Sequence, residues 1–169
     1  SMLHKIALAV FASLLLYAGL ATVALALDMR PTVSLDLAKR MADACEAKAK
    51  QEGWNLNIAV VDAGADLILF RRMPDAFLGS IDIALDKARS SARLPFPTRG
   101  IAKKVYGEDG KGGSVPGLAH VKGLMAFPGG LPIKVGDILI GAIGISGATG
   151  DQDEECAQVA IDAIAGDLN

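Results

Sequence analysis

Apolar residues recur every fourth position in the segment that follows residue 32, the spacing of one face of a helix. These positions are Leu37, Met41, Cys45 and Ala49, with charged residues between them. Thr32 or Ser34 can cap the start of this helix, because a hydroxyl accepts from the free backbone N–H groups of the first turn. We expect the helix to end at Gly53.

Two short apolar runs follow, at residues 57–61 and 67–72. They are separated by residues 62–66, in which Gly64 can adopt the positive φ of a tight turn. This pattern predicts a β-hairpin. Both faces of the strands are apolar, so we expect helices or another subunit to cover the sheet on both sides.

The rest of the chain alternates helical and strand patterns. A stripe of small residues predicts a helix over 80–93, and Thr98 can cap a short helix that reaches residue 106. Apolar runs predict strands at 124–127, 133–135 and 138–145, the last two joined by a two-residue turn. A capping box of Thr149 and Gln152 begins a final helix over about 152–165. The order predicts a single α+β domain with an antiparallel sheet of about five strands flanked by helices.

The N-terminal segment has the layout of a secretory signal. Residues 6–27 form a run of 22 residues without a charge, Lys5 precedes it, and Ala24 and Ala26 are small residues at the positions that signal peptidase reads. We therefore predict a signal peptide at residues 1–26, a domain at 27–169 and a periplasmic or secreted protein. The alternative is an uncleaved apolar helix that anchors the chain in the membrane, because such a run is also long enough to span it.

Composition limits the alternatives further. A chain of 169 residues that is 51% hydrophobic can form one core. Its net charge is −2 with acids and bases mixed, which gives no reason to expect nucleic-acid binding. Cys45 and Cys156 both lie on apolar helix faces. Buried packing is the default interpretation of each, and a disulfide between them is the alternative in an exported protein.

Basic residues provide the first candidate site. Alternation along the second strand of the hairpin places Arg71 and Arg72 on opposite faces, and Lys87 lies at the border of the small-residue stripe of its helix. Together they could form a cationic pocket for carboxylates. Ion pairs with Asp62, Asp82 or Asp86 are the structural alternative.

The sequence gives little support for a metal site or for a catalytic nucleophile. His120 is the only histidine after the leader, so a site with two histidines from one subunit is excluded. It could stand at the mouth of a pocket behind the glycine-rich loop 107–117, which we expect to be mobile, or simply face solvent. Residues 141–147 are glycine-rich but lack the lysine of a phosphate loop. We expect Gly141 and Gly144 to let a helix pack closely on the strand.

A set of motifs in one order resembles the GlcG/HbpS-like family. The motifs are residues 58–64 (IAVVDAG), 71–73 (RRM), 79–84 (GSIDIA), 87–89 (KAR), 129–133 (GGLPI) and 141–147 (GAIGISG), with 152–153 (QD). The resemblance implies a profilin-like fold and homo-oligomers. For several members, including the C-terminal domain of PduO-type proteins, it also implies binding of haem or a related tetrapyrrole.

The leading hypothesis is therefore an exported small-molecule-binding protein, with haem or a related tetrapyrrole as the ligand that the family resemblance implies. Its candidate ligand-binding residues are Arg71, Arg72, Lys87, His120, Gly129 and Gly130. The alternative is an enzyme or accessory protein that acts on a small hydroxy acid or another carboxylate metabolite, and a scaffold without a ligand is a third hypothesis. The family fixes the fold better than the function.

Overall fold

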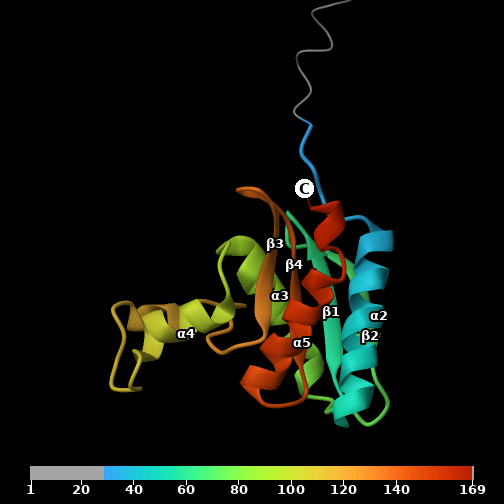
Figure 1. Cartoon of the computed structure of the whole chain (residues 1–169). Helices are drawn as coiled ribbons and strands as arrows, with labels where there is room; N and C mark the ends of the chain where they lie inside the picture. The colour runs from blue at the N-terminus through green and yellow to red at the C-terminus, as the bar shows by residue number, and fades with distance from the viewer. Residues whose placement is uncertain (1–28, 169) are drawn as a thin grey trace, which may run out of the picture. The chain divides into compact units, whose positions relative to one another are not determined.

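The computed structural model describes residues 29–168, and the residues from Pro31 onward form one compact unit (Figure 1). The predicted signal peptide at residues 1–26 lies outside the described residues. In the part of the chain that is described, no helix has both the length and the apolar character needed to cross a membrane.

The first described helix, α2 (Leu35–Glu52), begins and ends where the sequence predicts. The Ser34 hydroxyl accepts a hydrogen bond from the Leu37 backbone N–H, and Gly53 closes the helix with φ of 74°. A residue with a side chain would be strained in that left-handed conformation, which explains why glycine ends the helix.

A four-stranded antiparallel sheet follows, in the order β2-β1-β4-β3. Its strands are β1 (Asn57–Asp62), β2 (Leu67–Arg72), β3 (Gly130–Val135) and β4 (Ile138–Ser146). The hairpin of β1 and β2 and the hairpin of β3 and β4 were both predicted.

The predicted strand at 124–127 is wrong, so the sheet has four strands instead of about five. The Met125 backbone N–H donates to the Ser90 hydroxyl, 2.8 Å away, instead of to a strand neighbour. Leu124 and Ala126 pack in a small cluster with Ile101 and Val105. The apolar run therefore reflects contact with a helix.

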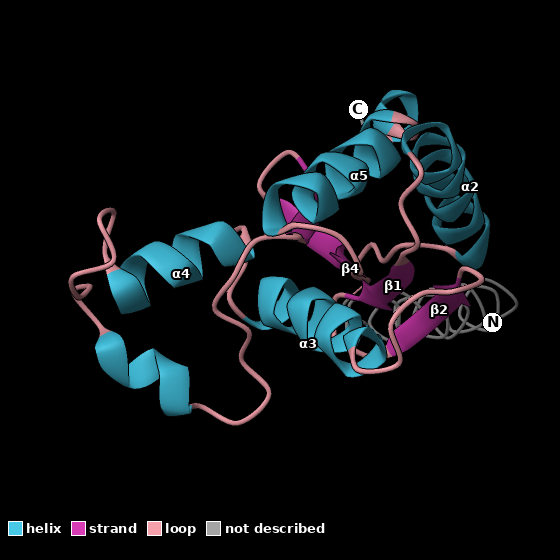
Figure 2. Ribbon diagram, turned by 90° about the horizontal axis from the view of Figure 1, so that it is seen from below, coloured by secondary structure: helices cyan, strands magenta, loops and turns pink. Residues whose placement is uncertain are grey.

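Helices cover both faces of the sheet, as expected (Figure 2). The helices are α3 (Ser80–Arg93), α4 (Thr98–Tyr106) and α5 (Gly150–Asp162), with short 3-10 helices η2 (Pro116–His120) and η3 (Ala165–Asp167). Ile58 and Val60 point into the core shared with α2 and α5, whereas Ala59 and Val61 point into the core shared with α3. β1 is thus buried on both sides.

The segment of α4 and η2 stands to one side of the sheet in both ribbon views (Figures 1 and 2). Thr98 does not cap α4 as predicted, because Pro97 is the N-cap residue and makes no side-chain cap. The Thr98 hydroxyl instead accepts from the Gly130 N–H, 2.9 Å away, and so fixes the start of β3. The expected mobility of the loop 107–117 stays a prediction.

Cys45 and Cys156 form a disulfide that joins α2 to α5. Both side chains are fully buried in the core between these helices. The default interpretation of two separately packed thiols is therefore wrong, because the two helix faces that carry them pack directly against each other.

Candidate functional site

Lys87 of α3 is fully buried and paired with Asp153 of α5. Its ammonium lies 2.7 Å from the Asp153 Oδ2 atom and donates to the Ile145 carbonyl at 2.8 Å. The two side chains are 0% and 3% exposed. The sequence suggested Asp62, Asp82 or Asp86 as partners for the basic cluster, but the partner of Lys87 comes from the last helix.

The position of Asp153 follows from the start of α5. The Thr149 and Gln152 capping box is present, which fixes the first turn of the helix. Asp153 then shares the buried face with Cys156, Ala157 and Ala160, at helical spacing. Its second oxygen, Oδ1, accepts from the Ala148 N–H at 3.1 Å.

Burial opposes the charges of this pair. Loss of water raises the pKa of Asp153, and the nearby Lys87 charge and the Ala148 N–H counteract part of that rise. Loss of water also lowers the pKa of Lys87, against the attraction of Asp153. Each group is held in place mainly by the other, which makes the pair costly to break.

Gly129 and Gly130, both candidate ligand residues, lie against Lys87. A Cβ atom at Gly129 would come within 2.7 Å of the Lys87 Nζ atom, and one at Gly130 within 2.5 Å of its carbonyl oxygen. Gly129 also has φ of 119°. The glycines let the chain close over the buried lysine, and the ring of Phe127 lies 4.9 Å from the Lys87 ammonium.

The structure does not bring the two candidate arginines to Lys87. Arg71 points to α2, where its guanidinium lies 2.7 Å from Asp43 and 2.8 Å from Glu46. Arg72 lies opposite Asn57 of β1, and is therefore on the other face, as the alternation predicted. Arg72 is exposed and makes no ion pair with any described residue.

His120 is exposed at the end of η2, in the segment beside the sheet. His120 does not line either of the two hollows described in the next paragraph. Within residues 29–168, no group of three or more His, Cys, Asp or Glu side chains is placed to hold a metal ion.

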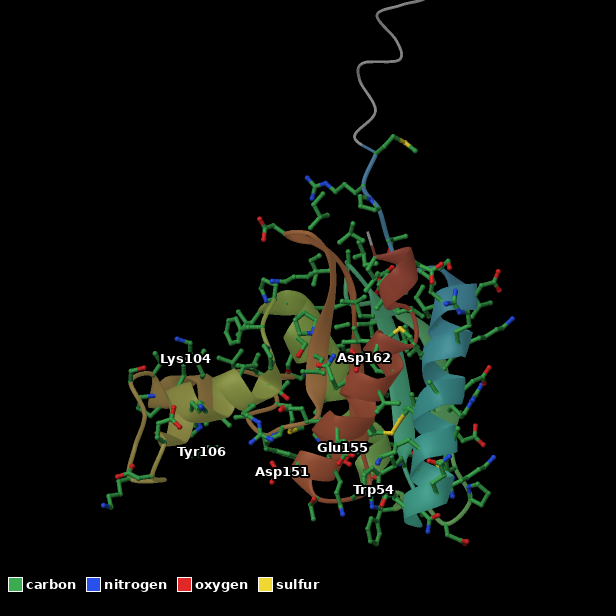
Figure 3. The ribbon with its side chains drawn as sticks, viewed as in Figure 1. Trp54, Lys104, Tyr106, Asp151, Glu155 and Asp162 are labelled. Atoms are coloured by element: carbon green, nitrogen blue, oxygen red, sulfur yellow. A yellow bond between two sulfur atoms is a disulfide. The ribbon has the colours of Figure 1, made fainter. Side chains whose placement is uncertain are left out.

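Two adjoining hollows lie at the end of the sheet where β1 begins. The first, of about 420 Å³, is lined by Gly53, Trp54, Asn55, Asp75, Phe77, Gly147, Ala148, Thr149 and Gln152. The second, of about 360 Å³, is lined by Phe77, Gly79, Ser80, Ile83, Phe127, Ser146, Gly147, Ala148, Gly150 and Asp153. Phe77, 71% exposed, stands between them. Figure 3 shows Trp54 at the same end of the domain as Asp151 of α5.

Sequence reasoning missed Asp153, Trp54, Phe77 and Phe127. Asp153 could have been found, because its spacing to Cys156 and Ala160 places a carboxylate on an apolar helix face. The three aromatic residues lie in or beside loops, where no periodicity marks a side chain as part of a surface hollow.

The chain matches a family model described as haem degrading protein HbpS-like over residues 33–162. It is 38% identical over 136 residues to an uncharacterized 15.0 kDa protein of Citrobacter freundii, covering 79% of this chain and 93% of that protein. It is 32% identical over 114 residues to protein GlcG of Escherichia coli, covering 68% of this chain and 81% of GlcG.

Solved structures of related proteins have the same fold as this chain. The crystal structure of HbpS has a TM-score of 0.75 at 26% identity, covering 82% of this chain and 94% of HbpS. The crystal structure of a complex of PduOC with haem has a TM-score of 0.71 at 30% identity, covering 79% of this chain and 95% of PduOC.

Proposed function

The chain belongs to the HbpS-like family, and from this membership we propose that it is an exported protein that binds haem or a related tetrapyrrole. The PduOC structure, which is 30% identical and has the same fold, is a complex with haem. The proposal places the ligand at the first hollow, whose lining includes Trp54 and Phe77.

The first hollow suits a planar apolar ligand. Two aromatic residues line it. Trp54 precedes β1 and Phe77 follows β2, so the two come from the two ends of the β1–β2 hairpin. Aromatic rings give a flat ligand a large contact area and favourable stacking. The exposure of Phe77, 71%, leaves an apolar surface that a ligand would cover.

Arg72 is the cation that fits the edge of this ligand. Arg72 lines neither hollow, but it ends β2 at the same end of the sheet as Trp54 and Phe77, and it pairs with no carboxylate among the described residues. A charge-assisted hydrogen bond to a propionate would contribute about 1.5–3 kcal/mol. Lys87 and Arg71 were equal candidates in the sequence, but both are occupied by carboxylates.

The residues present favour binding through the propionates over a strong bond from a histidine to the haem iron. His120, the only described histidine, is exposed on η2 and lines neither hollow. We therefore expect weak binding carried by Arg72, Trp54 and Phe77.

The disulfide between Cys45 and Cys156 supports export. Disulfides persist in oxidising compartments and are rare in the cytosol. Assembly into a homo-oligomer is part of the same proposal. It is supported by exposed apolar side chains at Tyr106, Val115 and Val121, in and beside α4 and η2, which a second copy would cover.

Titration of the purified chain with haemin tests the function. We expect a saturable shift of the Soret band, at least fivefold weaker binding in Arg72→Ala, and similar weakening in Trp54→Ala. Lys104→Ala removes an exposed charge from α4 and should bind as the parent does (Figure 3). Absence of any Soret shift, or loss of the shift in His120→Ala alone, would overturn the proposed mode.

A further inference from the structure

Lys48 of α2 lies between Trp54 and α5, both of which contribute to the first hollow. Trp54 lines the hollow just after the end of α2, and Gln152 lines it from the first turn of α5. The Lys48 ammonium lies 5.6 Å from the centroid of the Trp54 ring. It also lies 2.9 Å from the carboxylate of Glu155, which is three residues beyond Gln152 on α5. Lys48 lines neither hollow, so it can act on a ligand there only through its neighbours.

Two carboxylates fix the Lys48 ammonium in this position. Besides the contact with Glu155, it donates to Glu52, one turn further along α2, at 2.8 Å. Hydrogen bonds to Glu52 and then Glu155 raise the pKa of Lys48 above its ordinary value, so the side chain is charged at neutral pH. A cation within about 6 Å of an indole ring is attracted by the negative face of its π system. The Trp54 ring therefore has a fixed charge beside it.

The disulfide keeps α2 and α5 at the spacing that this contact needs. Cys45 lies three residues before Lys48, and Cys156 directly follows Glu155, so the covalent bond is about one helical turn from the ion pair. The Trp54 ring also packs against the apolar core between these helices. Apolar packing supports the ring without preferring a direction, whereas the attraction of a cation is strongest over the ring face. The orientation of the ring therefore depends on Lys48.

We propose that Lys48 is a positioning residue for the first hollow, which holds the Trp54 ring in the orientation in which a flat ligand stacks on it and links that ring to α5 through Glu155. This inference rests on the proposed function, because the stacked ligand is the haem or related tetrapyrrole placed there. A ring that is already held in its binding orientation loses less conformational entropy when the ligand arrives. Lys48 thus strengthens binding without touching the ligand.

Fluorescence of the ligand-free chain tests the orientation of the ring. Trp54 is the only tryptophan of the chain, so intrinsic tryptophan emission reports this ring alone. Lys48→Met keeps most of the apolar stem and removes the charge. We expect it to shift the emission maximum and to increase the fast component of the time-resolved anisotropy decay, because the ring rotates more freely. Lys48→Arg keeps a cation beside the ring and should restore both signals.

Haemin titration, followed at the Soret band, tests the consequence for binding. We expect Lys48→Met to bind haemin about two- to fivefold more weakly, the effect of losing one exposed cation–π contact. Lys48→Arg should bind as the parent does. Lys50→Met is the matched control, because Lys50 is also on α2 and also pairs with a carboxylate, Glu46 at 2.6 Å, and lines neither hollow. Should Lys48→Met fail to fold, Glu155→Gln removes only the ion pair with α5 and should weaken haemin in the same direction.

Two results would overturn the positioning role. The first is an emission maximum and an anisotropy decay in ligand-free Lys48→Met that equal those of the parent, which would show that packing alone orients Trp54. The second is equal haemin affinity in Lys48→Met and Lys50→Met. If the parent itself gives no Soret shift, the proposed function is wrong. The fluorescence of the ligand-free chain is measured without haemin, so the two failures are distinguishable.

Discussion

The Lys87 ammonium and the Asp153 carboxylate, 2.7 Å apart, join helices that lie on opposite faces of the sheet. Lys87 belongs to α3 on one face, and Asp153 belongs to α5 on the other. The pair therefore ties the two layers together at the end of the sheet that carries both hollows. The buried lysine therefore has a structural role in joining α3 to α5.

Breaking this pair should destabilise the fold strongly. Asp153→Ala leaves Lys87 buried without a counter-charge, and we expect the free energy of unfolding to fall by about 3–5 kcal/mol. The double variant with Lys87→Met and Asp153→Leu should lose much less, because it buries no charge. Urea unfolding of both variants measures this difference. Equal losses in the two would show that packing, and not charge, determines the cost.

The disulfide gives a second prediction about stability. Cys45 and Cys156 are 111 positions apart, so the bond closes a long loop in the unfolded chain. For a loop of about 100 residues the entropic model gives about 4.7 kcal/mol. We expect the reduced chain, and the double variant with Cys45→Ala and Cys156→Ala, to unfold at a clearly lower urea concentration than the oxidised parent. A midpoint unchanged by reduction would contradict an oxidised native state.

Local sequence rules predicted the elements of the fold well. Ser34, Gly53 and the Thr149 capping box act within one turn of a helix, so their effects can be read from neighbouring residues. The prediction of a strand at 124–127 was wrong because an apolar run alone does not show whether it packs against a helix or pairs with a strand. In the fold that run faces α4, and its backbone meets Ser90.

The site was harder to predict because its contacts join distant segments. Lys87 and Asp153 are 66 positions apart, and Arg71 meets Asp43 and Glu46 from 28 and 25 positions away. The sequence identified the basic residues but could not tell which of them a carboxylate would occupy. Only pairing in three dimensions distinguishes the exposed Arg72 from its buried or paired neighbours.

Glu46 should contribute to stability in a pH-dependent way. Hydrogen bonds from Lys50 and then Arg71 lower its pKa below the ordinary value of 4.5. A lowered carboxyl pKa stabilises the fold above the unfolded value, and that stability is lost as the pH falls through the folded value. Glu46→Gln should therefore be less stable than the parent at pH 6, with the difference vanishing as the pH falls below 4.5. Urea midpoints across this range provide the measurement, and a difference independent of pH would refute it.

Gly144 is the position where α3 touches the sheet most closely, as the sequence suggested. A Cβ atom there would lie 2.1 Å from the Ala84 carbonyl oxygen and 2.4 Å from the Ala88 nitrogen. Both are backbone atoms of α3, so no side chain can move to make room. The expected role of Gly141 differs in detail, because its close neighbours are the Val61 carbonyl and Val33 instead of a helix.

Gly144→Ala should consequently push α3 away from β4 and destabilise the chain by at least about 1–3 kcal/mol, the usual cost of overpacking a core. Because α3 carries Ser80, Ile83 and Lys87, the displacement should also disturb the second hollow. Gly166→Ala is the matched control, since a Cβ atom at Gly166 meets nothing within 4 Å. Urea unfolding should separate the two variants by that amount. If they unfold at the same urea concentration, α3 can shift freely on the sheet, and Lys87 is not held in the position that its pairing with Asp153 requires.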